Sequence, residues 1–183
     1  MILVFNDADI RIPLIILAVI VILICIAYLL LISCTLFFMY SFSREITKKL
    51  EFLNLIIYQK CEAINQISEE LSKYINETNP LYLFLNNPNY KEYHKLSTSE
   101  IEEFYYYTEK MITEIQKIYI NNDLEELKKP VEDFFKNIED MNEKYYQTSQ
   151  LYNTKVIGYN YWRNFFSTKW LKKILHIKEK QTI

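Results

Sequence analysis

The chain has 183 residues with a formal net charge of −2 at pH 7, and 50% of its residues are hydrophobic. One glycine and four prolines supply too few turns for a sheet protein, so the composition predicts an all-α fold. The single glycine also excludes a phosphate-binding loop and a dinucleotide fingerprint, because each of these motifs needs more than one glycine.

The first element is an uncharged run between Arg11 and Arg44. A helix of about 20 apolar residues crosses the hydrocarbon core of a bilayer. The sequence therefore predicts a transmembrane helix over residues 12–43, in contact with membrane lipids, after a short extramembrane segment of residues 1–11. A cleaved signal peptide is not expected, because its apolar core is shorter and its start is basic. The stretch "LISC" ending at Cys34 resembles a lipobox and leaves open a lipidated Cys34 at a mature N-terminus.

The charges beside this run predict its orientation. Arg44, Lys48 and Lys49 follow the run, whereas Arg11 is the one basic residue before it. Lysine and arginine collect on the cytoplasmic side of a membrane. The N-terminus is therefore expected outside a cell membrane, and the domain of residues 44–183 in the cytoplasm.

Residues 44–183 are predicted to form a bundle of long helices. Apolar residues recur there in alternating steps of four and three, which is typical of one helix face and of coiled coils. The three stripes run over residues 46–74, 101–118 and 131–166, and Lys60 is the one charged position of the first. The fold class predicted is an N-terminal transmembrane helix followed by an antiparallel helical bundle.

Local signals predict where two of these helices begin. Ser99 followed by Glu102 has the spacing of a capping box, which opens a helix. Pro130 suits the first turn of the next helix, where its missing N–H has no partner to lose.

The third stripe contains the pair Tyr-Asn twice, at Tyr152-Asn153 and Tyr159-Asn160. Seven residues make two helical turns, so both tyrosines fall on the stripe and both asparagines flank it. The tyrosines are expected to pack inward while the asparagines hydrogen-bond at the seam; an exposed binding face is the alternative. Gly158 is expected either to let a neighbouring helix approach closely or to mark a kink.

The last segment, from Trp162 to Lys180, is rich in aromatic and basic residues. Viewed as a helix, it gathers its apolar side chains on one side and its lysines on the remainder, as membrane-surface helices do. Residues up to Phe166 are expected to pack in the bundle and later ones to touch the inner leaflet. The residues predicted to contact the membrane surface are Lys169, Trp170, Lys172 and Lys173.

No catalytic, metal or cofactor site is predicted, and the protein is not expected to be an enzyme. His94 and His176 have no carboxylate or cysteine at ligand spacing, and the cysteines show no paired spacing. The acidic stretch of residues 100–143 argues against nucleic acid as a partner. No small-molecule substrate is evident.

Two stretches resemble the LemA family of bacterial membrane proteins. "IYQKCEAINQISEELSKY" (57–74) is similar to a run in the first bundle helix of that family, and "YNTKVIGYNYWRNFFS" (152–167) to a run in its last helix. The matching positions are Glu62, Ile64, Tyr74, Tyr152, Asn153, Val156, Tyr159, Asn160 and Phe166.

The chain also departs from the family pattern. Lys60 and Ser149 stand where arginines are usual, and Asn65 and Ser167 where prolines are usual. The resemblance therefore implies a divergent member, with a single span and a helical bundle but no established reaction.

Two functions remain open at this point. The first is a membrane-anchored helical scaffold or adaptor without enzymatic activity, which binds protein partners or associates with itself. The second is a lipid-sensing or membrane-remodelling module that uses the basic aromatic tail.

Overall fold

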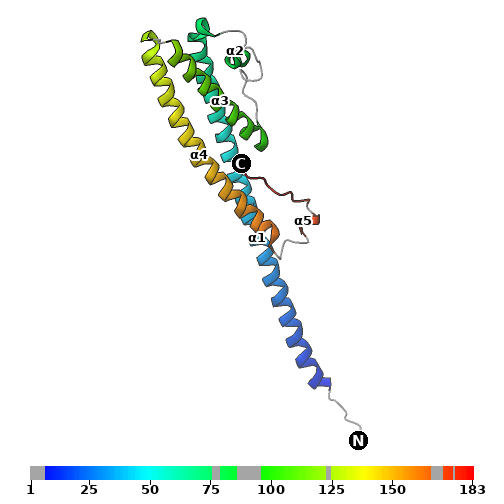
Figure 1. The fold of residues 1–183 in the computed structure, drawn as a ribbon. Coiled ribbons are helices and arrows are strands. Elements are labelled where there is room, and N and C mark those ends of the chain that lie inside the picture. Colours follow the sequence, from blue (N-terminus) through cyan, green and yellow to red (C-terminus); the bar gives the residue numbers. More distant parts are fainter. Residues whose placement is uncertain (1–6, 76–78, 86–95, 123–124, 166–170, 175) are drawn as a thin grey trace. The chain divides into compact units, whose positions relative to one another are not determined.

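The computed structural model describes residues 7–75, 79–85, 96–122, 125–165, 171–174 and 176–183. These residues form helices and short turns and contain no strand, so the predicted all-α fold class is confirmed. The elements are α1 (Asp7–Glu70), α2 (Pro80–Leu85), α3 (Thr98–Asn122), α4 (Lys128–Asn164) and α5 (Leu171–Ile174), with 3-10 turns at Ser72–Tyr74 and Glu125–Leu127 (Figure 1).

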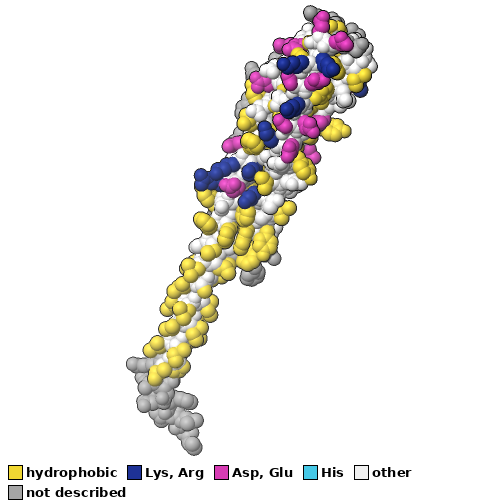
Figure 2. Space-filling model, turned by 90° about the vertical axis from the view of Figure 1, so that its left-hand side faces the viewer, with side chains coloured by type: hydrophobic (Ala, Val, Ile, Leu, Met, Phe, Trp, Pro, Cys, Tyr) yellow, Lys and Arg dark blue, Asp and Glu magenta, His cyan; other side chains and the backbone are white. Residues whose placement is uncertain are grey.

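Helix α1 continues without a break from the predicted transmembrane segment into the bundle, over 64 residues. Residues 12–34 expose their apolar side chains, with Ile32 alone half-buried. At about 1.5 Å per residue they span about 34 Å, more than the roughly 30 Å core of a bilayer. By length and composition α1 is able to cross a membrane, and Figure 2 shows hydrophobic side chains covering this part of it.

The chain folds as two compact units. One unit consists of Met1–Phe42 with Gly158–Lys180 and is called the anchor unit here. The other consists of Ser43–Ile157 with Gln181–Ile183 and is called the bundle unit. Helices α1 and α4 each contribute to both units, because α1 continues past residue 42 and α4 continues past residue 158.

The long helices of the bundle unit are α3 and the parts of α1 and α4 that belong to this unit (Figure 1), and the short α2 lies in it as well. The N–H of Leu96 donates to Asn54 Oδ1 at 2.8 Å, and further along both segments Lys60 binds Glu109, so α3 runs parallel to α1. Lys60 also donates to Asn142 Oδ1 at 2.7 Å. Figure 1 shows that the chain runs along α4 in the direction opposite to that of α1 and α3, so α4 is antiparallel to both.

The three predicted stripes supply the core of the bundle unit. Burying each large apolar side chain contributes about 1.5–3 kcal/mol, which explains why helices with one apolar face assemble in this way. The fully or nearly fully buried members include Leu53, Ile57, Ile64, Ile101, Met111, Ile115, Val131, Phe134 and Ile138. At the end of the third stripe the fully buried residue is Val156, whereas its neighbour Lys155, the predicted stripe position, is half-buried.

Helix α3 begins two residues earlier than expected. The capping box is Ser97 with Glu100, not Ser99 with Glu102: Ser97 N–H donates to Glu100 Oε2 at 2.6 Å, and Glu100 N–H to Ser97 Oγ at 3.4 Å. The backbone of Leu96, held by α1, fixes where the helix can start. These bonds from Ser97 also lower the pKa of the Glu100 carboxyl.

Gly158 allows a close approach inside the anchor unit. A Cβ atom at this position would lie 2.9 Å from the ring of Phe42 on α1, nearer than carbon atoms pack. The expectation of a close approach is confirmed, while α4 continues as one helix through this glycine.

The tail is not the continuous helix expected over residues 162–180. Helix α4 ends at Asn164, α5 covers only Leu171–Ile174, and residues 177–183 belong to no helix or strand. A helix would satisfy its backbone groups internally. Here side chains of α4 bind several of these groups instead, so the segment does not need to coil. Residues 177–183 are called the strap below.

Candidate functional site

In the bundle unit, the first Tyr-Asn pair binds the end of the strap. Asn153 Nδ2 donates to the carbonyl of Ile183 at 2.6 Å, and the N–H of Ile183 donates to Asn153 Oδ1 at 2.9 Å. Beside it, the hydroxyl of Tyr152 donates to the carbonyl of Gln181 at 3.0 Å. One side-chain amide therefore binds both backbone groups of one residue.

In the anchor unit, the second Tyr-Asn pair repeats this arrangement. Asn160 Nδ2 donates to the carbonyl of Lys180 at 2.8 Å, and the N–H of Lys180 donates to Asn160 Oδ1 at 3.1 Å. The hydroxyl of Tyr159 reaches the carbonyl of Lys178 at 3.5 Å. The four side chains Tyr152, Asn153, Tyr159 and Asn160 are called the Tyr-Asn clamp below.

The clamp combines packing with binding. Tyr152 and Tyr159 are 2% and 7% exposed, so the expectation that they pack inward is confirmed. Burial raises the pKa of the Tyr159 hydroxyl, although the neighbouring Arg163 opposes this shift. The asparagines are half-buried and do hydrogen-bond, but their partner is the strap rather than another helix.

Arg163, one turn after the second pair, extends the contact with the strap. Its Nε donates to the carbonyl of Ile177 at 3.1 Å, and its Nη1 lies 3.5 Å from Glu179 Oε2. The ammonium of Lys180 lies 5.8 Å from the ring centre of Tyr159, a distance at which an aromatic face still attracts a cation. Together with the bonds made by the two Tyr-Asn pairs, most contacts with the strap go to its backbone groups.

A buried lysine occupies the core of the bundle unit. Lys60 is 0% exposed; it binds the carboxylate of Glu109 and Asn142 Oδ1, and its ammonium lies 4.1 Å from the ring centre of Tyr105. Tyr105 stacks on Tyr145 with ring centres 3.9 Å apart. Burial lowers the pKa of Lys60, and the hydrogen bond and charge of Glu109 oppose this shift.

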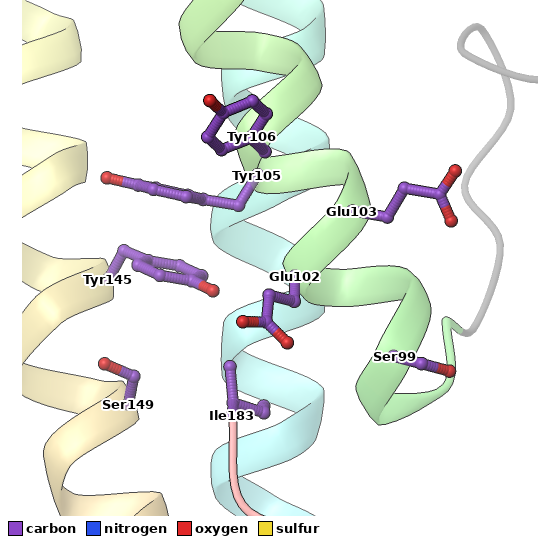
Figure 3. Close-up of a pocket in the computed structure, with 8 residues that line it drawn as sticks. All are labelled: Ser99, Glu102, Glu103, Tyr105, Tyr106, Tyr145, Ser149 and Ile183. Carbon is purple, nitrogen blue, oxygen red and sulfur yellow. The ribbon is translucent and has the colours of Figure 1, made fainter.

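A pocket of about 620 Å³ lies in the bundle unit next to the end of the strap (Figure 3). Tyr105 of α3 and Tyr145 of α4 lie one above the other, and Glu102 and Ile183 lie below them in this view. None of the described lining residues is basic, so the pocket has an acidic and aromatic wall. Its lining residues are Ser99, Glu102, Glu103, Tyr105, Tyr106, Tyr145, Ser149 and Ile183.

The other residues singled out in the sequence fall into different surroundings. Ile64 and Val156 are buried in the bundle core, whereas Glu62 and Tyr74 are exposed. Tyr74 lies in a 3-10 turn after α1 has ended, so it does not continue the first stripe inward. These positions, unlike the two Tyr-Asn pairs, do not gather at one place.

The basic tail residues are only partly described. Lys172 is half-buried in α5 and donates to Asn164 Oδ1 at 3.2 Å, and Lys173 is exposed. Phe166, Lys169 and Trp170 lie outside the described residues.

Sequence reasoning identified the clamp residues but not their ligand. The strap carries no apolar periodicity and its bonds use backbone atoms, so no side-chain pattern pointed to it. Within the described part of the chain, no three histidine, cysteine or acidic side chains gather as metal ligands. Comparison of the chain with family models, with curated proteins and with solved structures found no match.

Proposed function

We propose that the protein is a single-pass, membrane-anchored scaffold without enzymatic activity, which binds an extended segment of a partner protein through its Tyr-Asn clamp. The observation that carries this proposal is that each asparagine binds both the N–H and the carbonyl of one strap residue. Contacts to backbone groups supply affinity for an extended peptide whatever its side chains. The strap is the occupant within the chain, and a partner segment replaces it.

The membrane setting is part of the same proposal. The apolar part of α1 holds the protein in a cell membrane, with the N-terminus outside and the bundle in the cytoplasm. The basic residues Arg44, Lys48 and Lys49 after the span support this orientation. The resemblance of the two quoted stretches to the LemA family supports the same arrangement, and we propose that the chain is a divergent member of that bacterial family.

A peptide with the strap sequence, IKEKQTI, tests the proposed function. The full chain in detergent is titrated against the fluorescent peptide, and binding is followed by anisotropy. Replacing Asn153 and Asn160 together by alanine is expected to weaken binding more than tenfold, because four backbone bonds are lost. The control is Asn137→Ala, an exposed asparagine on the same helix. Equal affinity of the clamp variant and this control contradicts the proposal.

The lipid-sensing alternative has one observation in its favour. In the anchor unit, the rings of Phe38 and Trp162 stack with centres 4.9 Å apart, next to Phe165. Aromatic rings at the end of a span are typical of a membrane interface, and Lys172 and Lys173 follow in the same unit.

Lipid contact by the tail is tested in vesicles. The full chain is reconstituted with anionic or neutral brominated lipids, and the quenching of its tryptophans is compared. The lipid-sensing function predicts stronger quenching in anionic vesicles, and loss of that difference when Lys172 and Lys173 are both changed to glutamate. Equal quenching in the two lipids before any substitution contradicts it.

A further inference from the structure

We infer that the pocket beside Asn153 is a binding site for a lysine or arginine side chain, and that it selects segments with such a side chain at the position of Ile183. The pocket is the cavity of about 620 Å³ described above and is called the acidic pocket here. Asn153, Ile183 and the lining residues all belong to the bundle unit. For partner segments the inference rests on the proposed function, whereas for the strap it rests on the contacts of residue 183.

Asn153 determines which strap residue lies at the acidic pocket. Its side chain binds both the N–H and the carbonyl of Ile183, at 2.9 and 2.6 Å, so the strap cannot shift along α4 without losing both bonds. The Ile183 side chain is half-buried and lines the pocket, below Glu102 in Figure 3. A longer side chain at this position therefore has room to extend into the pocket.

The wall of the acidic pocket lacks a positive charge. Glu102 and Glu103 of α3 line it, and within the described part of the chain neither of them takes part in an ion pair. Isoleucine places an apolar side chain beside these carboxylates. The ammonium of a lysine or the guanidinium of an arginine would instead form charge-assisted hydrogen bonds with them.

A buried hydroxyl in the same wall is also available to a donor. Tyr145 is 8% exposed, and its hydroxyl has no hydrogen-bond partner among the described residues, although most buried polar side-chain atoms have one. Burial, Tyr105 and the charge of Glu102 raise its pKa to about 12, so the hydroxyl is neutral at pH 7. Its end of the ring points toward Glu102 (Figure 3). One cationic group there can therefore donate to both the carboxylate and the hydroxyl oxygen.

The aromatic part of the wall suits a cationic side chain as well. The rings of Tyr105 and Tyr145 stack with centres 3.9 Å apart, and the ammonium of Lys60 already lies 4.1 Å from the ring centre of Tyr105. Aromatic faces attract cations, and the long aliphatic stems of lysine and arginine pack on apolar surface while the charged end stays polar. Isoleucine at position 183 is therefore a weak occupant, which a segment with a cation at this position displaces.

The inference is tested first within the full chain in detergent. The protection of the residue 183 amide against hydrogen exchange, relative to the unbound sequence, measures how tightly Asn153 holds it. Ile183→Lys is compared with Ile183→Met, since methionine is also long and unbranched but carries no charge. Lysine is expected to raise the protection about threefold to tenfold over methionine, as for a partly exposed ion pair with an added aromatic contact.

Two matched pairs of substitutions control for the origin of this difference. Glu102→Gln with Glu103→Gln removes the charge of the acidic pocket and is expected to abolish the difference between lysine and methionine. Glu132→Gln with Glu139→Gln removes the same charge from exposed positions of α4 and is expected to keep the difference. Equal protection in Ile183→Lys and Ile183→Met overturns the inference, and so does a difference that survives the loss of Glu102 and Glu103.

The same selection is then measured between molecules. The full chain in detergent is titrated against the fluorescent peptides IKEKQTK and IKEKQTM, which differ only at the residue that corresponds to Ile183. The lysine peptide is expected to bind about threefold to tenfold more tightly, and to lose this advantage in Glu102→Gln with Glu103→Gln. Equal affinities overturn the inference. If neither peptide binds although Ile183→Lys raises the protection within the chain, the proposed function fails while the selection by the acidic pocket stands.

Discussion

At the scale of single residues, the side-chain amide of Asn153 both donates and accepts a hydrogen bond. Each of its two bonds to Ile183 contributes about 0.5–1.5 kcal/mol, so Asn153→Ala is expected to weaken strap binding by about 1–3 kcal/mol. Asn153→Asp is expected to weaken it further, because a carboxylate keeps the acceptor but faces the carbonyl of Ile183. The rate of hydrogen exchange at the Ile183 amide measures both effects. An unchanged rate in Asn153→Asp would show that the amide donor is not needed.

Tyr152 separates packing from hydrogen bonding. Its side chain is 2% exposed, so Tyr152→Ala is expected to lower the free energy of unfolding by about 3–5 kcal/mol, as for other buried aromatic residues. Tyr152→Phe removes only the hydroxyl that binds Gln181 and is expected to cost about 1 kcal/mol. Denaturant unfolding measures both values. Tyr146→Ala, an exposed tyrosine on the same helix, serves as the control, and near-native stability of Tyr152→Ala would place this ring outside the core.

Removing Glu109 is expected to lower the free energy of unfolding more than removing Lys60. Lys60 is fully buried, whereas the Glu109 side chain is 38% exposed. Glu109→Gln leaves an ammonium buried without its counter-charge and is expected to cost about 3 kcal/mol or more in unfolding free energy. Lys60→Met leaves a carboxylate that water reaches, so its cost is expected to be smaller. A larger loss in Lys60→Met than in Glu109→Gln would contradict this assignment.

The cost of Glu109→Gln is also expected to depend on pH. Burial lowers the pKa of Lys60 in the folded chain below its unfolded value of 10.5, and removing Glu109 lowers it further. Between these two pKa values the unfolded chain binds more protons, so the free energy of unfolding rises with pH. The loss caused by Glu109→Gln therefore shrinks as the pH rises toward 10.5. Unfolding is compared below pH 9.0, where the Cys61 thiol, whose pKa burial raises from 9.0 to about 11, contributes little to the pH dependence.

At the scale of elements, the helices were predictable and the strap was not. The stripe beginning at Ile46 predicted the bundle half of α1, and the stripes beginning at Ile101 and Val131 predicted α3 and α4. They could be found because an apolar face repeats at a fixed interval whatever it packs against. The strap is bound through its backbone, which leaves no such pattern. The partners of Lys60 could not be predicted from the sequence either, since Glu109 and Asn142 are 49 and 82 residues away along the chain.

The contact between α1 and α4 in the anchor unit depends on Gly158. A leucine there would overlap the ring of Phe42, and overpacking of this kind costs about 1–3 kcal/mol. Gly158→Leu is therefore expected to lower the thermal stability of the protein in detergent, and Phe42→Ala in the same chain is expected to restore part of it. If Phe42→Ala adds its full cost to that of Gly158→Leu, the two residues do not share a contact.

At the scale of the whole molecule, the two units have different surfaces. The anchor unit exposes the apolar residues 12–34 of α1, whereas charged residues lie on the bundle unit, as on the face shown in Figure 2. Anchoring predicts that the full chain stays in the membrane pellet at high salt and alkaline pH. Ile22→Arg with Leu23→Arg, near the middle of the span, is expected to release it, because each arginine costs about 2.5–3.5 kcal/mol there. Gln116→Arg with Gln147→Arg, at exposed bundle positions, is the control.

The orientation of the chain gives the last prediction. Three basic residues, Arg44, Lys48 and Lys49, follow the span, and the excess of lysine and arginine on the cytoplasmic side of membranes predicts a cytoplasmic bundle. A cysteine at the exposed position Gln150 is therefore expected to resist a membrane-impermeant maleimide in intact cells and to react after lysis. Labelling in intact cells would place the bundle outside. If Cys34→Ala also abolished lipid labelling of the chain, the lipobox interpretation would replace the transmembrane one, since an acylated Cys34 anchors its domain on the outer side.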